Sequence, residues 1–425
     1  MGSAALFVEG ATLDGVEVGL RCADGVIAEL GPGVAGREGD ERVDGVGTAI
    51  APGFINAHTH AAMTLFRGYA DDLPLMEWLE QHIWPAEARL EPEDVYWGAR
   101  LACAEMIRSG TVGFWDMYWQ PGATARAAED AGLRATIGAP LIDGADSSAT
   151  ARLREQAALG LAELDGSGDL ISPAFAPHAI YTVSEASLRW LAERSAESGI
   201  PIQIHLSEIE AEVEGCLREH GLRPAHYLDR LGVLGPRTLL AHAVWLDDGE
   251  RDVIAASGAT IVTNPSANLK LAVGEIFDYP AARAAGIPVA LGTDGAGSNN
   301  ALDPLGELKQ FALIQKHRAR DTGAITATEA LAVATGRRAP LLGAAAAPRL
   351  GGAADFILVR VETPALALGT LDAGLAYAAN ATVVDTTVVA GRVLMSGGRL
   401  AGEGLERIVA QARERASRLG LSSAK

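Results

Sequence analysis

Between residues 54 and 292 the chain alternates short apolar stretches with longer amphipathic ones, which limits its fold more than any other feature. Eight apolar stretches have the length and composition of buried strands. They cover residues 54–57, 111–115, 134–139, 171–176, 200–205, 238–241, 259–263 and 287–292. Helical patterns separate them, for example over 94–108, 149–165, 185–197 and 250–257. Eight β/α units across about 300 residues predict an α/β protein with a (β/α)8 TIM barrel, whose functional groups lie at the strand carboxyl ends.

A doubly wound open sheet is the alternative fold for such an alternation. That fold requires a glycine-rich turn after its first strand, and none follows residues 54–57. The glycine pair Gly295-Ala296-Gly297 comes only after the last strand and does not form the dinucleotide fingerprint. The barrel is therefore favoured.

The two ends of the chain are β-like and punctuated by turn signals such as Asp14-Gly15 and Asp24-Gly25. Strands are expected at 5–8, 16–20, 26–30, 355–359, 381–384 and 388–394. Neither end can bury a sheet face alone, so we expect residues 1–53 and 349–400 to form one composite β-domain. The barrel then covers 54–348, ending in an alanine-rich linker at 344–347, and residues 401–425 form a C-terminal helix.

Composition excludes several classes of partner. A net charge of −19 and a pI of about 4.9 argue against nucleic acids and anionic membranes, which attract basic surfaces. No apolar run approaches the roughly 18 residues of a membrane span, and no secretory signal is apparent. Three scattered cysteines, Cys22, Cys103 and Cys216, argue against a thiol metal site. We expect a cytoplasmic protein with reduced cysteines.

Histidines and one aspartate occur at the ends of the predicted strands. His58 and His60 end the first strand, and because strand side chains alternate between faces, both imidazoles share one face. Alone, such a pair is equally well two polar residues at a strand end. Further candidates end the fourth, fifth, sixth and eighth strands: His178, His205, His242 and Asp294. Since these ends converge on one barrel mouth, the set predicts a metal site.

Four of these side chains supply three imidazoles and a carboxylate and leave one position for water. They are His58, His60, His205 and Asp294. Such ligands suit Zn²⁺, with Fe²⁺ as the alternative ion. Two-metal barrels of this kind use a carbamylated lysine on the fourth strand, whereas this chain has no lysine before Lys270. We therefore expect one metal ion per chain.

Several motifs resemble a known family. Residues 54–60, 205–208, 241–242 and 292–295 are similar to the amidohydrolase superfamily, and residues 61–68, 78–90, 268–272 and 293–300 resemble its 5′-methylthioadenosine/S-adenosylhomocysteine deaminase group. The resemblance covers nearly the whole chain. It implies a distorted barrel with a small β-sandwich built from both termini. It also implies hydrolytic deamination of the adenine 6-amino group of a 5′-substituted adenosine (5′-methylthioadenosine, S-adenosylhomocysteine, adenosine or 5′-deoxyadenosine).

In that chemistry a metal-bound hydroxide attacks C6 of adenine, because the metal lowers the pKa of water to about 7. Glu208, which follows His205 closely, is expected to carry a proton from the water to ring N1 and then to the departing amine. Its alternative role is a solvated carboxylate in the acidic run 208–214. Asp294 would accept a hydrogen bond from the attacking water, and His242 would polarise that water.

The resemblance also implies four substrate-binding residues: Glu87, His178, Trp78 and Ser298. Glu87 matches the position whose carboxylate accepts both ribose hydroxyls, and is otherwise a helix-surface charge. His178 would contact the substrate or serve as an outer hydrogen-bonding residue. Trp78 packs against the 5′ substituent or belongs to the core, and Ser298 contacts the base or metal-site waters.

Members of the group that bind homocysteine can place arginines after the third strand. Residues 137–142 contain none, and we expect Arg134, Arg152 and Arg154 to lie on solvated helices. A 5′-substituted adenosine with an uncharged tail therefore fits at least as well as S-adenosylhomocysteine.

Two other readings stay open. A related hydrolase acting on guanine, 8-oxoguanine or a chlorinated triazine would share the metal ligands but have no use for a ribose-binding Glu87. A non-catalytic assembly protein would have lost ligands, and none is missing. The expected partner is a small-molecule nucleoside, and the sequence is compatible with a homo-oligomer.

Overall fold

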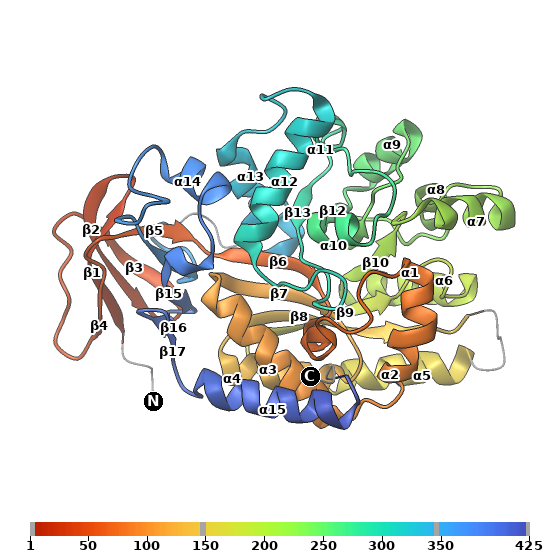
Figure 1. Cartoon of the computed structure of the whole chain (residues 1–425), viewed down its shortest axis with the longest axis horizontal. Helices are drawn as coiled ribbons and strands as arrows, with labels where there is room; N and C mark the ends of the chain where they lie inside the picture. The colour runs from red at the N-terminus through yellow and green to blue at the C-terminus, as the bar shows by residue number, and fades with distance from the viewer. Residues whose placement is uncertain (1–4, 145–149, 344–347, 422–425) are drawn as a thin grey trace.

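A computed structural model describes residues 5–144, 150–343 and 348–421, and in them a parallel barrel lies beside a mixed sheet (Figure 1). All eight predicted barrel strands are present. Their bounds are β6 (Phe54–Thr59), β7 (Thr111–Met117), β8 (Arg134–Leu141), β9 (Ile171–Pro177), β10 (Ile202–Leu206), β11 (Thr238–His242), β12 (Thr260–Thr263) and β13 (Val289–Leu291). Each strand pairs in parallel with its neighbour in sequence, which confirms the barrel prediction.

The barrel closes through the residues that follow its short last strand. The backbone N–H groups of Thr293 and Asp294 both donate to the carbonyl of His58, at 3.2 and 3.0 Å. The Asn56 amide reinforces this seam by donating to the Thr293 hydroxyl at 2.8 Å and accepting the Thr293 N–H at 3.0 Å. Loop contacts thus replace a regular ladder between β13 and β6, and the barrel is distorted at this seam.

Helices cover the outside of the barrel, and several begin at side-chain caps. Ser184 caps α6 by accepting the Ser187 N–H, and Asp247 and Glu250 form a capping box at the start of α9. The helices are α1 (Leu75–Trp78), α2 (Trp84–Glu87), α3 (Pro92–Arg108), α4 (Pro121–Ala131), α5 (Thr150–Ala162), α6 (Glu185–Ser198), α7 (Glu210–His220), α8 (Pro224–Arg230), α9 (Asp248–Ser257), α10 (Pro265–Lys270), α11 (Tyr279–Ala284), α12 (Pro304–Ala319), α13 (Ala327–Ala334), α14 (Leu371–Tyr377) and α15 (Leu405–Arg418).

Both chain ends build one mixed sheet, as expected. Its strands are β1 (Leu6–Leu13), β2 (Val16–Ala23), β3 (Val26–Gly31), β4 (Glu41–Asp44), β5 (Thr48–Pro52), β14 (Phe356–Arg360), β15 (Val384–Val389), β16 (Arg392–Ser396) and β17 (Arg399–Leu400). The two halves join where β5 pairs antiparallel with β14, and Figure 1 shows red and blue strands side by side there. Apolar residues of both halves then share one buried cluster.

Two predicted strands at the C-terminal end are wrong. Residues 388–394 hold the end of β15, a turn at Ala390-Gly391 and the start of β16. Residues 381–383 form a 3₁₀ turn (η4, Ala381–Val383), and the strand β15 begins only at Val384. The Asn380 side chain accepts the Thr382 N–H at 3.0 Å, and this local bond favours a turn over a ladder. The predicted linker 344–347 lies outside the described residues.

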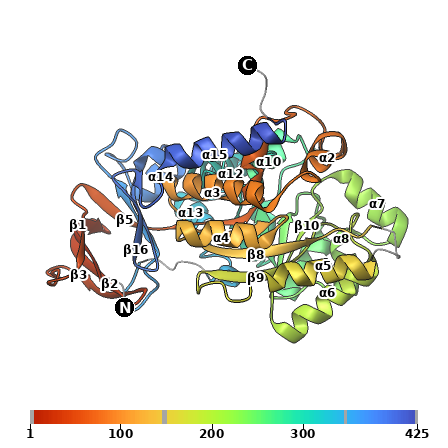
Figure 2. The ribbon, with the colours of Figure 1, turned by 90° about the horizontal axis from the view of Figure 1, so that it is seen from below.

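The C-terminal helix α15 packs along α3 on the outside of the barrel (Figure 2). Its Arg418 forms an ion pair with the buried Asp94 carboxylate and donates to the Arg89 carbonyl at 3.0 Å. Arg89 in turn donates to the Leu419 carbonyl at 2.9 Å. The end of the chain therefore supports residues just before α3.

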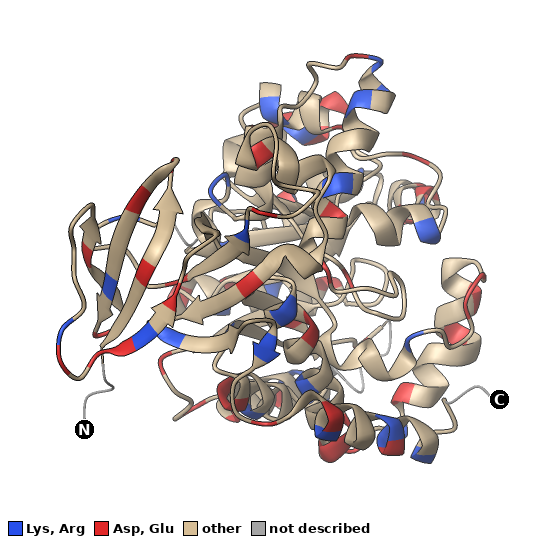
Figure 3. Ribbon diagram, turned by 60° about the vertical axis from the view of Figure 1, so that its left-hand side comes forward, with Lys and Arg blue, Asp and Glu red and all other residues tan. Residues whose placement is uncertain are grey.

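Acidic and basic residues are interspersed over the outer helices and the terminal sheet (Figure 3). No helix within the described residues is long and apolar enough to cross a membrane.

Candidate active site

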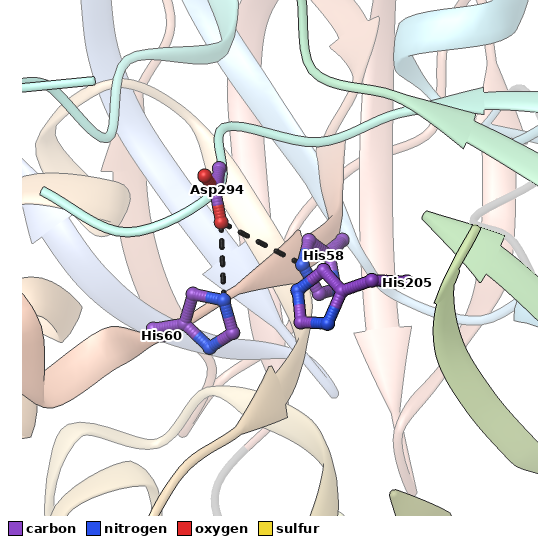
Figure 4. A group of neighbouring side chains, drawn as sticks. All are labelled: His58, His60, His205 and Asp294. Atoms are coloured by element: carbon purple, nitrogen blue, oxygen red, sulfur yellow. Dashed lines mark ion pairs between the residues drawn. The ribbon is translucent and has the colours of Figure 1, made fainter. Parts of the chain in front are cut away.

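Four of the predicted ligands meet at the carboxyl ends of three barrel strands (Figure 4). His58 lies in β6 and His60 directly after it, His205 lies in β10, and Asp294 follows β13. One ligand atom from each residue lies within 4.8 Å of the others. The strand ends thus bring together side chains that are up to 236 positions apart in the sequence.

Hydrogen bonds to backbone carbonyls orient two of the imidazoles. The Nδ1–H of His60 donates to the Met117 carbonyl at 2.6 Å, and that of His205 donates to the His178 carbonyl at 2.7 Å. Each ring therefore presents the lone pair of Nε2 to the site, as metal-ligating histidines do. Burial lowers the pKa of His205 well below its usual value, which keeps that ring neutral and able to ligate.

The Asp294 carboxylate completes the group. Its Oδ1 lies 3.1 Å from His60 Nε2 and 3.6 Å from His58 Nε2, and the Ser298 hydroxyl donates to its Oδ2 at 2.5 Å. Both ring nitrogens of the fully buried His58 and the Oδ1 of Asp294 have no hydrogen-bond partner among the described residues. Buried polar atoms without partners are costly, and a cation between His58 Nε2 and Asp294 Oδ1 would satisfy these two atoms. These residues form a metal site.

Left-handed backbone conformations follow the strands at this mouth. Ser207, His242 and Asp294 have φ values of 48°, 71° and 62°, which L-residues rarely adopt. Such conformations persist only where surrounding contacts hold them, and they are concentrated at functional sites. Here they turn the chain sharply where β10 and β11 end and after β13.

Glu208 lies in this turn and lines the same cavity as the metal ligands. Its side chain is buried, and burial raises its pKa. The Glu212 carboxylate, also buried, accepts the N–H of Ser207 at 2.8 Å and that of Glu208 at 3.1 Å. The acidic run is therefore not one solvated face, because Glu212 and Glu208 point inward while Glu210 is exposed. Sequence reasoning missed the part that Glu212 plays in shaping this turn.

His242 ends β11 beside Glu208, with Nδ1 3.7 Å from Glu208 Oε1. Its Nδ1–H donates to the Asn268 Oδ1 on α10 at 2.8 Å. Asn268 is a second residue whose position sequence reasoning did not assign, although it lies in one of the quoted motifs. The helical repeat of the sequence gave no signal for this role of Asn268, because its hydrogen-bond partner, His242, lies 26 residues earlier in the chain.

The outer side of the cavity is formed by residues 67–90, which we call the wall segment. It follows the 3₁₀ helix η1 (Ala61–Phe66) and contains α1, a π-turn (η2, Leu79–Ile83) and α2. Trp78 is buried and Glu87 half-buried, and both line the cavity. Trp119, also unforeseen, donates from Nε1 to Glu87 Oε2 at 3.1 Å. Single π-turns are common at functional sites, and this one lies between Trp78 and Glu87.

His178 lines the cavity, and its Nδ1 lies 2.9 Å from the Thr182 hydroxyl. Burial lowers its pKa to about 4, so the ring is neutral. Ser298 also lines the cavity while its hydroxyl is engaged by Asp294. Nine of the ten predicted site residues therefore border one cavity, and the tenth, the metal ligand His58, is fully buried beside Asp294.

The arginines near the third strand lie elsewhere. Arg134 is not on a helix as expected but begins β8, where it pairs with Asp355 at 2.7 Å. Arg154, on α5, donates to the Ser187 hydroxyl at 2.8 Å and lies over the Trp190 ring. Arg152 is exposed on the same helix.

The cavity measures about 720 Å³ including its open mouth, which suits a nucleoside. The described residues that line it include no arginine and no lysine. Apolar side chains of the wall segment form one side, and His60, His205, His242, Glu208 and Asp294 form the base. Acid–base groups and metal ligands thus meet an apolar binding surface.

A barrel with three histidines and an aspartate around a metal position defines a metal-dependent hydrolase. The chain belongs to the amidohydrolase family, which matches residues 49–394.

Curated relatives span nearly the whole chain. A 5′-deoxyadenosine deaminase of Methanoregula boonei is 44% identical, over 93% of this chain and 91% of its own. The 5-methylthioadenosine/S-adenosylhomocysteine deaminase 1 of Archaeoglobus fulgidus is 42% identical, over 95% and 96%. Among solved structures, an adenosine deaminase from Xanthomonas campestris with bound zinc superimposes with a TM-score of 0.90 at 33% identity, covering 99% of both chains.

Proposed function

We propose that the protein hydrolyses the 6-amino group of a 5′-substituted adenosine to give the inosine analogue and ammonia, using one zinc ion. The observation that carries this proposal is the meeting of the metal ligands with Glu208, His242 and Glu87 around one cavity. The relatives named above act, by their names, on 5′-deoxyadenosine, methylthioadenosine and S-adenosylhomocysteine.

The donor set fits zinc. Three imidazoles and one carboxylate leave an open coordination position, as catalytic zinc sites do, and the Xanthomonas campestris neighbour binds zinc. Nε2 of His58 and Oδ1 of Asp294, which have no hydrogen-bond partner among the described residues, are free to ligate such an ion. When bound, zinc supplies the Lewis acidity that makes water nucleophilic at neutral pH.

The remaining chemistry is proton transfer by Glu208. Water adds to C6 of the adenine ring while Glu208 takes a proton from that water and delivers it to N1. His242 accepts a hydrogen bond from the hydroxyl that has formed on C6, and Asp294 orients the attacking water. Glu208 then takes the proton of the C6 hydroxyl and delivers it to the amine, the bond from C6 to nitrogen breaks as the C6 carbonyl forms, and ammonia leaves.

Glu87 and the wall segment bind the rest of the nucleoside. Trp119 donates to Glu87 Oε2, and the Glu87 carboxylate accepts the ribose hydroxyls, which carboxylates bind strongly. His178 contacts the base, and Trp78 packs near the 5′ substituent. An uncharged tail fits best, because the described cavity lining offers no cation to a carboxylate and already carries Glu87, Glu208 and Asp294.

An ultraviolet deamination screen tests the proposal with 5′-methylthioadenosine, 5′-deoxyadenosine, adenosine, S-adenosylhomocysteine and guanine. We expect turnover of the first three, with a higher kcat/KM for the uncharged tails than for S-adenosylhomocysteine. Deamination of guanine alone, or of no nucleoside by the zinc-loaded protein, would refute it.

A further inference from the structure

The wall segment supplies much of the cavity lining but has little regular structure of its own. Leu75, Trp78, Leu79, Ile83, Trp84 and Glu87 all line the cavity. Its helices α1 and α2 have four residues each, and such short helices are not stable without tertiary contacts. The position of the wall segment must therefore be set by contacts with the barrel.

One lysine makes several such contacts at once. The Nζ of Lys270 donates to Asp71 Oδ1 at 2.7 Å, Asn300 Oδ1 at 2.6 Å and the Gly297 carbonyl at 3.0 Å. Asn300 also donates from Nδ2 to Asp71 Oδ2 at 2.8 Å. All three ammonium protons are used, and three loops meet at this group.

The backbone around Asp71 depends on this group. Ala70 and Asp72 have φ values of 54° and 66°, left-handed conformations that cost free energy in L-residues. Both side chains of the ion pair are about one quarter exposed, so solvent reaches the pair in part. The contacts of Asp71 with Lys270 and Asn300 therefore hold a strained turn at the start of the wall segment.

The same contacts reach the reacting groups. Lys270 ends α10, the helix whose Asn268 accepts from His242. Gly297, whose carbonyl accepts from Lys270, precedes Ser298, which donates to Asp294. A methyl group at Gly297 would lie only 3.0 Å from Cζ2 of Trp78, so the Trp78 indole packs directly on this backbone.

We infer that Lys270 is a positioning residue that latches the wall segment, through Asp71 and Asn300, against the loops carrying His242 and Asp294. The inference rests on the proposed function for its kinetic consequence. Because Trp78 and Glu87 hold the nucleoside in the ground state and the transition state alike, loosening the wall segment weakens binding more than it slows chemistry.

The test compares Lys270→Met, Lys270→Arg, Asp71→Asn and the Lys270→Met/Asp71→Asn double variant, with Lys309→Met as control. Lys309 is exposed on α12, so its substitution removes the same charge away from the latch. We expect Lys270→Met to raise KM for methylthioadenosine by about tenfold or more, with kcat changed by less than about threefold. Lys270→Arg should recover part of this loss, and the double variant should be no worse than Lys270→Met, because both changes break one interaction.

Hydrogen–deuterium exchange and bound-metal content give readouts that need no turnover. In Lys270→Met, peptides from the wall segment should exchange faster while those from β10 and β11, and the zinc content, match the wild type. If the wild type deaminates no nucleoside, the proposed function fails while the exchange result still decides the latch.

Three outcomes would overturn the latch. They are unchanged exchange in the wall segment, uniformly faster exchange across the chain in every latch variant, and a loss restricted to S-adenosylhomocysteine. The last would mean that Lys270 binds the substrate's carboxylate instead of Asp71.

Discussion

Asn268 Oδ1 lies 2.8 Å from Nδ1 of His242, and this contact orients the His242 ring. The amide oxygen accepts the Nδ1 proton, so the other ring nitrogen, Nε2, keeps its lone pair in the neutral ring. His242 also has a left-handed φ of 71°, so its ring depends on outside support.

Replacing Asn268 should therefore impair the reaction without removing the metal. We expect Asn268→Ala to lower kcat by about 10- to 100-fold, the usual range for partners of site histidines. Steady-state kinetics with zinc analysis checks this. Leu269→Ala, an exposed neighbour on the same helix, serves as the control. Wild-type kcat in Asn268→Ala would show that the contact is incidental.

Glu208 is expected to carry the protons of the reaction. Glu208→Gln keeps the size of the side chain but cannot accept a proton, so kcat should fall by about 10²- to 10⁴-fold with zinc retained. Glu210→Gln, on an exposed position of the following helix, should behave as the wild type. Comparable activity in both variants would show that a group other than Glu208 carries the protons.

Glu87 is expected to recognise ribose. Loss of a hydrogen bond to a charged acceptor costs about 1.5–3 kcal/mol, so Glu87→Gln should lower kcat/KM for adenosine by roughly 10- to 150-fold. The loss should shrink for 2′,3′-dideoxyadenosine, which lacks the hydroxyls that Glu87 would accept. An equal loss for both nucleosides would point to a packing role instead.

Removing the metal should abolish activity and lower thermal stability. Ligand binding to the folded state alone stabilises it by about 2.7 kcal/mol at a free concentration of 100 Kd. Chelation should therefore lower Tm, and added zinc should restore both Tm and turnover. Asp294→Ala should show little bound zinc and a Tm that zinc does not raise.

The buried carboxylate of Glu307, which does not line the cavity, should make stability depend on pH. Burial raises the pKa of Glu307 to about 7, against hydrogen bonds from Asn299 at 2.7 Å and the Ser266 N–H at 3.1 Å. A pKa raised in the folded state means that the unfolded chain ionises first. The stabilising contribution of protonated Glu307 to the folded state is therefore complete below about pH 4.5, and it is lost as pH rises through about 7.

Denaturant unfolding of the wild type and Glu307→Gln at several pH values checks this. Between pH 4.5 and 8 the free energy of unfolding of the wild type should fall by about 2–3 kcal/mol relative to that of Glu307→Gln. A constant difference across that range would mean that Glu307 titrates normally.

Much of the fold could be predicted because strand and helix periods are local properties. The eight barrel strands begin or end within a few residues of the predicted positions, since apolar runs bounded by turn signals set them. The turn at 381–383 was missed because a single side chain, Asn380, redirects a sequence that otherwise reads as a strand. Strand propensity does not account for a local hydrogen bond from one side chain to the backbone.

The sequence by itself determined the donor chemistry of the site. Its histidines and Asp294 occur at strand ends, and parallel strands in a barrel deliver those ends to one mouth. It also determined that no lysine is available on β9 to bridge two ions.

Only the tertiary structure decided how those donors are aimed. The contacts of Asn268 with His242, Ser298 with Asp294, Trp119 with Glu87 and Lys270 with Asp71 join different loops. The direction of a hydrogen bond and the choice of a ring nitrogen depend on three-dimensional geometry that no local pattern encodes. The chemical identity of the site residues can therefore be predicted from the sequence. Their orientation and support follow from the packing of loops around the barrel mouth.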